Sequence, residues 1–509
     1  MLAGVISASL VGIEGLLVRV EVDLTHGLPM FDLVGLPDPA VRESRERVRA
    51  AIRNSGYRFP VQRITINLAP AAVKKIGPHF DLPIAVGILA AQGLLKKEKV
   101  GSYLIAGELS LSGQVRKIKG VLPMALKAKE AGLSGIIIPE GNYAEGMLVE
   151  ELPIIPVREL ANIADYFNQG RVIDLERAGN SPRTGRPEIS IDLKEVRGQE
   201  EAKRALEVAA AGSHNILMIG PPGTGKTMLA KRLKTILPPL TRTETLEISK
   251  IYSTLGLIEA DLGLVQQRPF RRPHHNISPA GLIGGGKIPE AGEASLAHLG
   301  ILFLDELPEY HRNVLETLRQ PLEDGEITII RAAMTAKFPA RFMLVAAMNP
   351  CPCGYYGDSL KECSCNTSLI KRYRARVSGP LLDRIDIHLE VPRPTVEEIT
   401  GEKAMGEGSQ EVRERVMLAH RIQQERYQQQ GFYYNAELTG KRLEKYCVIK
   451  RTGQHLLKEA LETLGLSARA YHRILRLART IADLEQSEEI ANEHLAEAIQ
   501  YRSLDRKVF

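Results

Sequence analysis

The segment GPPGTGKT at residues 220–227 constrains the fold more than any other feature of the chain. It follows the apolar run NILMIG (215–220) and precedes the helix candidate TMLAKRLKTIL (227–237), which is the strand–loop–helix setting of a P-loop. Glycines let such a loop wrap phosphate groups, whose charge faces backbone N–H groups and the amino end of the helix. Lys226 is expected to reach the β and γ phosphates, and Thr227 to bind Mg²⁺. We predict a nucleotide site that comprises Gly220, Pro221, Pro222, Gly223, Thr224, Gly225, Lys226 and Thr227.

Two further apolar runs end in polar residues, GILFLDE (300–306) and RFMLVAAMN (341–349). Runs of this length are typical of a parallel sheet covered on both faces, whose ligands bind beyond the carboxyl ends of the strands. Asp305 would hold Mg²⁺ through water and Glu306 would polarise the attacking water, so the site should hydrolyse ATP. Asn349 either orients that water or senses the γ-phosphate, or it is a turn-forming residue before Pro350.

The length of 509 residues exceeds what one hydrophobic core usually supports, and we predict three domains. The segment ERAGNSPRTGRPEIS (176–190) has the composition of a linker between folded units. Residues 1–175 alternate strand runs such as RITINLA with helical stretches, which predicts a mixed α/β domain. Residues 190–395 would form the P-loop core with its parallel sheet. Residues 396–509 have apolar positions three or four apart, which predicts a helical lid.

The composition and the start of the chain predict where in the cell the protein is and which partners its charge allows. The chain has no run of 18 apolar residues, so no membrane span is expected. Its start lacks a basic region and carries Glu14, unlike a secretory signal, and we predict a cytoplasmic protein. A formal net charge of +6 permits a polyanionic partner without requiring one.

Four of the five cysteines lie close together in two C-x-C pairs. Cys351, Cys353, Cys363 and Cys365 could hold a structural Zn²⁺ as a tetrahedral site, although C-x-C is tighter than the usual ligand spacing. The alternative is four reduced thiols in a packed or mobile loop. Both interpretations stay open at the level of sequence. Cys447 stands apart and is expected in a core.

Several long segments together resemble the magnesium-chelatase-like AAA+ family, in its competence-protein ComM (YifB-type) branch. The resemblance covers almost the whole chain. It is carried by LVGLPDPAVRESRERVRAAI, VRGQEEAKRALEVAAAGSHNILMIGPPGTGKT, RPFRRPHHNISPAGLIGGG, GEASLAHLGILFLDELPEY, LRQPLEDGEITIIRA, AAMNPCPCGYYGD, SGPLLDRIDIHLEV and SARAYHRILRLARTIADL.

The resemblance assigns roles by position. It implies that Asp305 and Glu306 are the Walker B pair and that Asn349 is sensor 1. It implies that Arg384 is similar to an arginine finger that reaches a neighbour's ATP, and that Arg469 is sensor 2, with Arg473 as the alternative. Gly198 and Gln199 resemble the segment that lines the adenine pocket. A finger acting on a neighbour implies a homo-oligomeric ring, for which six subunits is the family expectation.

The resemblance also implies a DNA motor, a branch-migration helicase that acts on single-stranded or branched DNA during natural transformation. Two segments are candidates for DNA contact, RPFRRPHH (268–275) and the hairpin-like GEITIIRAAMTAKF (325–338). The alternative is that these are structural segments with solvated charges. If the segments contact DNA, its phosphates would bind Arg271, Arg272, Arg331 and Lys337.

Two rival functions remain to be compared. Residues 1 to about 170 resemble the domain shared with Lon proteases, which need a Ser nucleophile and a Lys base. His79 stands where the Ser belongs and Leu122 where the Lys belongs, so we expect a non-proteolytic domain. His79 near Asp81 is interpreted as structural. The other rival is the ATPase subunit of a metal-chelatase-like complex, which we expect to resemble only the later part of this chain.

Overall fold

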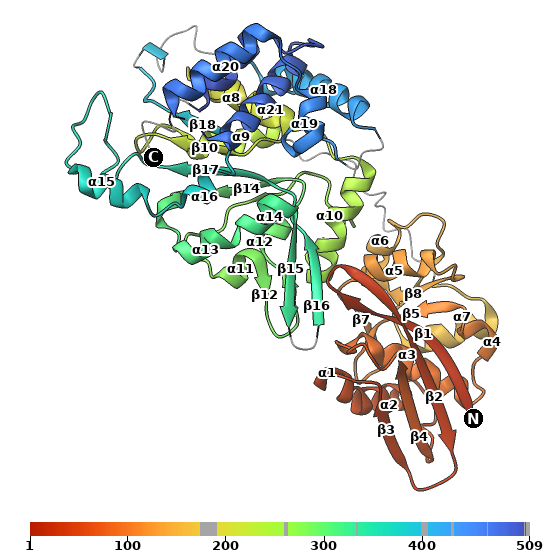
Figure 1. The fold of residues 1–509 in the computed structure, drawn as a ribbon. Coiled ribbons are helices and arrows are strands. Elements are labelled where there is room, and N and C mark those ends of the chain that lie inside the picture. Colours follow the sequence, from red (N-terminus) through yellow and green to blue (C-terminus); the bar gives the residue numbers. More distant parts are fainter. Residues whose placement is uncertain are drawn as a thin grey trace.

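The computed structural model describes residues 1–173, 191–258, 263–331, 334–395, 397–398, 406–428, 432–465, 467–502 and 504. An N-terminal α/β domain lies at one end, and a sheet-and-helix core with a C-terminal helical region forms the rest (Figure 1). The predicted linker at 176–190 and the predicted start of the lid at residue 396 lie outside the described residues. Those two boundaries therefore stay predictions.

The N-terminal domain is built on a seven-stranded mixed sheet with the order β3-β4-β2-β1-β5-β8-β9. Helix α3 (Asp81–Ala91) is buried along its whole length, which explains why its sequence is apolar on every side. The strand predicted at RITINLA is β4, with the same bounds. The strands are β1 (Leu2–Val11), β2 (Glu14–Thr25), β3 (Met30–Val34), β4 (Arg63–Ala69), β5 (Tyr103–Ile105), β6 (Glu108–Leu109), β7 (Val115–Arg116), β8 (Gly135–Pro139) and β9 (Ile154–Val157). The other helices are α1 (Pro39–Arg42), α2 (Ser44–Asn54), α4 (Lys97–Val100), α5 (Val121–Glu130), α6 (Tyr143–Gly146) and α7 (Leu160–Gln169).

The core sheet has five parallel strands in the order β11-β14-β17-β10-β18. Alternate residues of these strands face two separate apolar clusters. One is shared with helices α8 (Glu200–Gly212) and α9 (Lys226–Ile236) and the C-terminal helices, and the other with helices α11 (Pro279–Ile283) to α14 (Arg319–Asp324). The three predicted strand runs are confirmed as β10 (Ile216–Ile219), β14 (Ile301–Leu304) and β17 (Met343–Met348). The remaining strands are β11 (Phe270–Arg271), β12 (Gly284–Gly285), β13 (Glu290–Ala291), β15 (Glu326–Arg331), β16 (Met334–Pro339) and β18 (Ile387–Glu390).

The helices of the core enclose this sheet on both faces (Figure 1). Helix α10 begins with a capping box in which Thr241 and Glu244 bond each other's backbone N–H groups. The core helices are α8 (Glu200–Gly212), α9 (Lys226–Ile236), α10 (Arg242–Leu255), α11 (Pro279–Ile283), α12 (Glu293–Leu296), α13 (Arg312–Thr317), α14 (Arg319–Asp324), α15 (Thr367–Arg374) and α16 (Gly379–Leu382).

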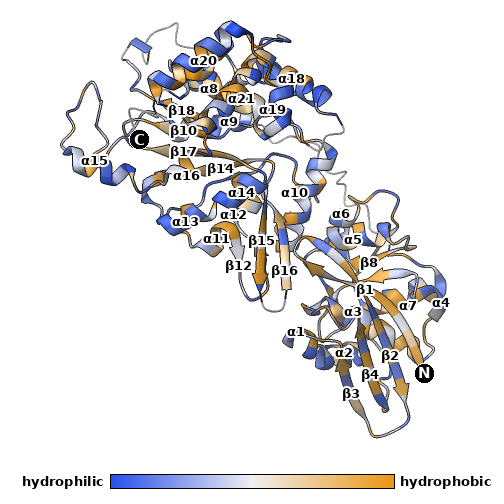
Figure 2. Ribbon diagram, in the orientation of Figure 1, coloured by the Kyte–Doolittle hydropathy of each residue, from blue (hydrophilic) through white to orange (hydrophobic). Residues whose placement is uncertain are grey.

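The C-terminal region is helical, as the spacing of its apolar residues predicts. Its helices are α18 (Ser409–Arg426), α19 (Gly440–Tyr446), α20 (Arg451–Leu464), α21 (Ala468–Leu484) and α22 (Asn492–Gln500). Polar residues cover their outer faces and apolar residues line the inner ones (Figure 2). His214, which precedes β10, bonds Thr480 of α21 at 2.7 Å and Asp386 at 3.3 Å. This buried contact fixes α21 against the amino ends of the core strands.

Contacts on two sides join the N-terminal domain to the core. Beside α10, the backbone N–H of Gly120 donates to the carbonyl of Ser253 at 2.9 Å, and the Ser253 hydroxyl donates to the buried Glu145 carboxylate. Farther along, the turn between β1 and β2 meets the β15–β16 hairpin, where Ile13 enters the apolar cluster of the hairpin. Gly12 lies so close that a Cβ there would come within 2.9 Å of the Lys337 carbonyl oxygen.

Among the described residues, no helix is both long and apolar enough to cross a membrane.

Candidate nucleotide site

The P-loop leaves the carboxyl end of β10 and enters α9 at Lys226. Gly223 and Gly225 have φ angles of +82° and +84°, a left-handed conformation that side chains disfavour and glycine adopts freely. Both turns occur at glycines of the predicted motif, and the motif stands between the predicted strand and the predicted helix. The local geometry therefore matches the phosphate-binding loop that the sequence predicts.

Lys226 is buried at the base of this loop, with 9% of its surface exposed. Its Nζ donates to the carbonyls of Gly220 and Pro221 at 2.7 and 2.8 Å and lies 3.4 Å from Oδ1 of Asn349. Burial lowers the pKa of Lys226 to about 8, and the Asp305 carboxylate acts in the opposite direction. A phosphate at the loop would favour the charged ammonium in the same way as Asp305 does.

The carboxyl ends of β14 and β17 meet the P-loop. Oγ1 of Thr227 donates to Oδ2 of Asp305 at 2.9 Å, and Asn349 reaches Lys226 from the next strand. Glu306 follows Asp305 in a left-handed conformation at φ +54° and is exposed. The structure thus brings Lys226, Thr227, Asp305 and Asn349 together, as a site for Mg²⁺ and a triphosphate requires. Thr227 and Asp305 are the residues that fit Mg²⁺, since both offer the oxygen ligands it prefers.

Two residues lie at this site that the sequence did not place here, Arg272, which was predicted as a DNA contact, and His275. Nη2 of Arg272 donates to Oδ2 of Asp305 at 2.8 Å, and its guanidinium lies 5.6 Å from the centre of the Phe303 ring. Nδ1 of His275 is 3.7 Å from a carboxylate oxygen of Glu306. The segment RPFRRPHH, predicted as a DNA contact, therefore supplies side chains to the acidic pair. These contacts arise because residues 270–271 form strand β11 and pair with β14, and the sequence alone does not reveal which strand pairs there.

Gln199 lies on the other side of the loop. It has a φ of +56°, and its Nε2 donates to the carbonyl of Thr224 at 2.8 Å and to that of Pro392 at 3.4 Å. Gly198, with φ +61°, precedes it against Glu398. Both residues border the P-loop, where the adenine pocket is expected.

The two arginines assigned by resemblance lie at the opposite edge of the sheet. Arg384 precedes β18, whose start pairs with the start of β10, so it lies at the amino ends of strands whose carboxyl ends carry the P-loop. Nη1 of Arg469 bonds Asp383 at 3.1 Å, and Arg384 pairs with Glu323. The chain therefore does not bring Arg384 or Arg469 to its own P-loop. It brings them close to each other.

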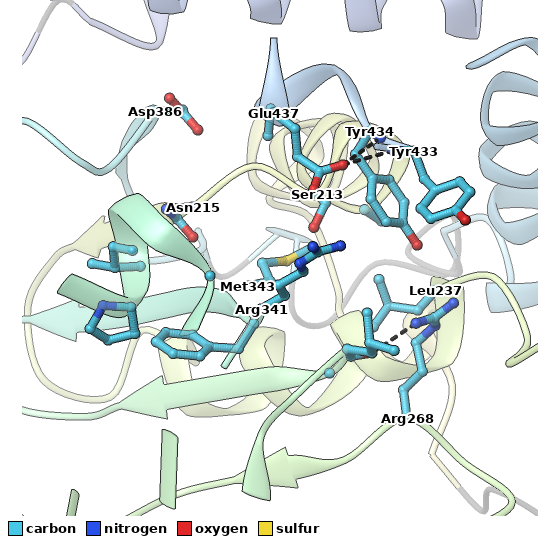
Figure 3. Close-up of a pocket in the computed structure, with 18 of the residues that line it drawn as sticks. Ser213, Asn215, Leu237, Arg268, Arg341, Met343, Asp386, Tyr433, Tyr434 and Glu437 are labelled. Atoms are coloured by element: carbon cyan, nitrogen blue, oxygen red, sulfur yellow. Dashed lines mark hydrogen bonds between the residues drawn. The ribbon is translucent and has the colours of Figure 1, made fainter. Parts of the chain in front are cut away.

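A cavity of about 780 Å³ opens at that amino edge, between the core and the C-terminal helices (Figure 3). Arg473, with 5% of its surface exposed, lies in its lining, and its Nη1 has no hydrogen-bond partner among the described residues. Burial lowers the pKa of Arg473 to about 10, against the effect of Asp386. The lining carries both signs of charge. It includes five arginines, Arg268, Arg341, Arg384, Arg473 and Arg476, and seven acidic residues, Glu244, Glu247, Glu323, Asp324, Asp383, Asp386 and Glu437.

The other candidate DNA contacts divide into two groups. Arg271 is half-buried and bonded to Glu293 at 2.6 and 2.7 Å, and its role as a DNA contact stays a prediction. The predicted hairpin is confirmed as β15 and β16, and its tip at 332–333 lies outside the described residues. Arg331 beside the tip donates to the Gly286 carbonyl at 3.1 Å, and exposed Lys337 pairs with Glu326 at 2.7 Å. Arg272, Arg331 and Lys337 are exposed, whereas Arg271 is half-buried.

The positions compared with a protease have no catalytic arrangement. The ring of His79 is buried and lies tilted against that of Phe80, with centroids 4.3 Å apart, and its Nε2 is 2.9 Å from the Ala8 carbonyl oxygen. Asp81 is bonded to Arg47 at 2.7 and 3.0 Å rather than to His79. Leu122 is a fully buried residue in the first turn of α5. The structural interpretation of His79 fits this packing.

The four clustered cysteines converge, with their sulfur atoms all within 4.8 Å of one another. Cys447 is buried in the C-terminal helical region, as expected.

Comparisons with known families match most of the chain. A model described as magnesium chelatase, subunit ChlI, matches residues 192–399, and one for the ChlI C-terminal part matches 406–502. A third, described as subunit ChlI of Mg-chelatase, matches residues 20–142. The expectation that likeness to the chelatase subunit is confined to the later part of the chain was therefore wrong.

Individual relatives match along the full length. The chain is 45% identical to "Competence protein ComM" of Haemophilus influenzae, over 99% of this chain and 98% of that protein. It is 44% identical to "Uncharacterized protein YifB" of Salmonella typhimurium over the same shares. A Lon protease of Mycolicibacterium smegmatis is 28% identical over 31% of this chain and 21% of that protein.

Proposed function

The chain belongs to the magnesium-chelatase-like family of AAA+ ATPases, in the branch of the ComM and YifB proteins, and from this premise we propose that it is an ATP-driven ring motor that acts on DNA. The family supports an ATPase that uses ATP and Mg²⁺. Movement on DNA, the ring and a role as a branch-migration helicase in natural transformation are our proposal. We place this activity in the cytoplasm, where ATP and DNA are both present.

One observation carries the hydrolytic part of the proposal, the meeting of three strand ends at the P-loop. Thr227 and Asp305, 2.9 Å apart, offer Mg²⁺ two neighbouring oxygen ligands. Lys226 lies between the loop carbonyls and Asn349, where it can follow the γ-phosphate as charge develops on it. Glu306 is exposed beside the pair, as a residue that polarises an attacking water must be.

The ring is supported by the separation of complementary groups within one chain. Charge on the γ-phosphate in the transition state is usually stabilised by an arginine, and Arg384 and Arg469 lie at the sheet edge away from the P-loop. A second copy of the chain, placed with its P-loop against the edge that carries Arg384 and Arg469, would complete the site. Such a head-to-tail contact closes into a ring when the rotation between copies allows it.

The DNA part is supported by the β15–β16 hairpin. It is an antiparallel pair with an exposed Ile330, and Arg331 follows that residue near the tip. In a ring, a projecting hairpin with cationic side chains can contact the phosphates of a strand in the central opening. Lys337 is on the same hairpin and is also exposed.

Proteolysis is not proposed for the N-terminal domain, since His79 and Leu122 supply no nucleophile and no base. Its match to the relatives and its partial likeness to a Lon protease support a common α/β architecture that serves the ring. We propose that this domain has a non-proteolytic role.

The test is the steady-state ATPase rate of the full chain with Mg²⁺, alone and with single-stranded, duplex and branched DNA at low salt. We expect DNA to stimulate the rate strongly, most with single-stranded or branched DNA, and Lys226→Ala to remove the rate. Stimulation should weaken as salt rises, because phosphate contacts release counterions. An ATPase rate that no DNA changes would contradict the DNA proposal and favour the chelatase-like alternative, a remodelling ATPase that acts on a protein or tetrapyrrole partner.

A further inference from the structure

The loop between β17 and α15 holds the cysteine cluster. Cys351 is buried, and its Sγ is 3.3 Å from that of Cys353 and 3.7 Å from that of Cys363. Cys353 and Cys363 are 3.6 Å apart. These separations are far longer than the ~2.05 Å of a disulfide bond, so the four groups are thiols. Four sulfur atoms from two parts of one loop therefore lie within 4.8 Å of one another.

We propose that Cys351, Cys353, Cys363 and Cys365 bind one Zn²⁺ ion as a tetrahedral tetrathiolate site. A zinc–sulfur bond of ~2.3 Å gives a tetrahedron whose sulfur atoms are ~3.8 Å apart. The separations of 3.3, 3.7 and 3.6 Å and the limit of 4.8 Å over the whole set match that size. An iron–sulfur cluster places its cysteines on different iron atoms, which requires a wider arrangement.

The spacing that counted against zinc in the sequence is explained by the turn within each pair. Gly354 has a φ of +88°, and its N–H donates to the Cys351 carbonyl at 3.0 Å, which folds the first pair back on itself. In the second pair the N–H of Cys365 points at Sγ of Cys363 at 3.4 Å. A backbone donor of this kind stabilises a metal-bound thiolate. Each C-x-C can thus direct both of its sulfur atoms to one point.

The loop around the cluster is held from outside by residues of neighbouring elements. Nε of Arg374 donates to the Pro350 carbonyl at 3.0 Å, and its guanidinium lies 5.2 Å from the centre of the Tyr356 ring. Asp358 is almost fully buried and pairs with Arg393 at 2.9 Å. The contacts hold the loop in place, and the four sulfur atoms face one another without a covalent bond between them.

The site lies next to the nucleotide site, which gives it a role that rests on the proposed ATPase function. Asn349 directly precedes the loop. Gly354 packs on the P-loop, because a Cβ there would be 2.7 Å from Cδ of Pro222. A metal that fixes the loop would therefore fix Asn349 and one wall of the P-loop. We assign the ion a structural role that positions these groups for ATP.

The assignment of zinc is tested by elemental analysis of the full chain, purified without a histidine tag. We expect about one zinc per chain. The double variant Cys353→Ser with Cys365→Ser should lose the zinc, whereas Cys447→Ser, which removes a buried thiol elsewhere, should keep it. Circular dichroism shows whether each variant folds. Less than about half a zinc per chain, zinc retained by the double variant, or iron in place of zinc would overturn the assignment.

A second measurement does not depend on variants that fold. Growth with Co²⁺ in place of Zn²⁺ should give a protein with the intense visible absorption of tetrahedral cobalt bound to thiolates. The same absorption in Cys447→Ser is expected. A weak spectrum, typical of octahedral cobalt with oxygen ligands, would count against the four-sulfur site.

The link to the nucleotide site is tested with two glycines of the same loop. Gly354→Ala and Gly357→Ala both place a side chain at positive φ, +88° and +79°, but only the first meets Pro222, since nothing lies within 4 Å of a Cβ at residue 357. Both variants should retain zinc, because the strain of one alanine at positive φ is small against the binding free energy of a structural zinc ion. We expect Gly354→Ala to weaken the binding of a non-hydrolysable ATP analogue about tenfold or more, and Gly357→Ala to change it less than about twofold.

Equal binding in the two glycine variants would overturn the positioning role and leave the zinc assignment in place. Zinc in a wild-type chain that binds no ATP would instead contradict the proposed function and not the metal site. The two failures are therefore distinguishable.

Discussion

Nη2 of Arg272 donates to Oδ2 of Asp305 at 2.8 Å, and this is the oxygen that also accepts from Thr227. Thr227 and Asp305 are the two residues expected to hold Mg²⁺, so the guanidinium shares the carboxylate with the metal or is displaced by it. Arg272 directly follows β11, in the segment that leads to α11. The occupancy of the metal site is thus connected to the position of that segment.

We expect Arg272→Gln to lower the Mg²⁺ concentration needed for half-maximal ATPase activity, by about threefold to tenfold, because a competing cation is removed from Asp305. The matched control is Arg271→Gln, which removes the neighbouring arginine that pairs with Glu293 and not with Asp305. A Mg²⁺ titration of the ATPase rate measures both. If Arg272→Gln needed more Mg²⁺ than the wild type, the competition would be refuted.

Lys226→Ala should remove nucleotide binding, and Glu306→Gln should keep binding but stop turnover. Lys226 lies within the P-loop, whereas Glu306 is an exposed residue next to the metal carboxylate. Loss of a group that acts on the attacking water lowers the rate constant without removing ground-state contacts. Fluorescent ATP binding and single-turnover hydrolysis separate the two effects. Hydrolysis at the wild-type rate by Glu306→Gln would sink its assignment.

Arg384→Ala alone should lose ATP turnover, and so should Lys226→Ala alone. Mixed in equal amounts, the two should recover roughly one quarter of the wild-type rate, because one interface in four joins an intact P-loop to an intact finger. Arg469→Ala in place of Arg384→Ala tests whether sensor 2 also acts on the neighbour. Mixtures with no more activity than their components would count against action between chains.

The stability of the N-terminal domain should fall as the pH drops below about 6.5. Burial lowers the pKa of His79 to about 4, below its ordinary value of 6.5, so the unfolded chain binds the proton more tightly. The stabilisation is present above the unfolded pKa and is lost as pH falls through the folded one, about 2 kcal/mol of it between pH 7 and pH 5. Thermal unfolding of His79→Gln should depend less on pH than that of the wild type. His472→Gln, at an exposed site, should behave as the wild type.

The sequence predicted the P-loop, strands β4, β10, β14 and β17 and the β15–β16 hairpin because each depends on a local pattern. The apolar runs that end in Asp305 and Asn349 needed only the rule that parallel strands share their carboxyl edge. The contact of Arg272 with Asp305 was missed because it depends on which strand lies beside β14. Arg384 and Arg469 received their roles from resemblance. The edge of the sheet at which they lie depends on how α21 packs against His214 and Asp386, which the sequence does not show. The meeting of the cysteines depends on a turn at Gly354 that spacing alone does not reveal.

Ile13 packs in the apolar cluster that includes the β15–β16 hairpin. The N-terminal domain is therefore a mechanical support for the segment that we propose contacts DNA. Force received at the hairpin would pass through the β1–β2 turn into a seven-stranded sheet, rather than being borne by the two hairpin strands alone. A chain shortened to its ATPase part would expose the apolar surface that Ile13 covers and would leave the hairpin free to bend. Such a chain could still split ATP while converting little of that energy into movement.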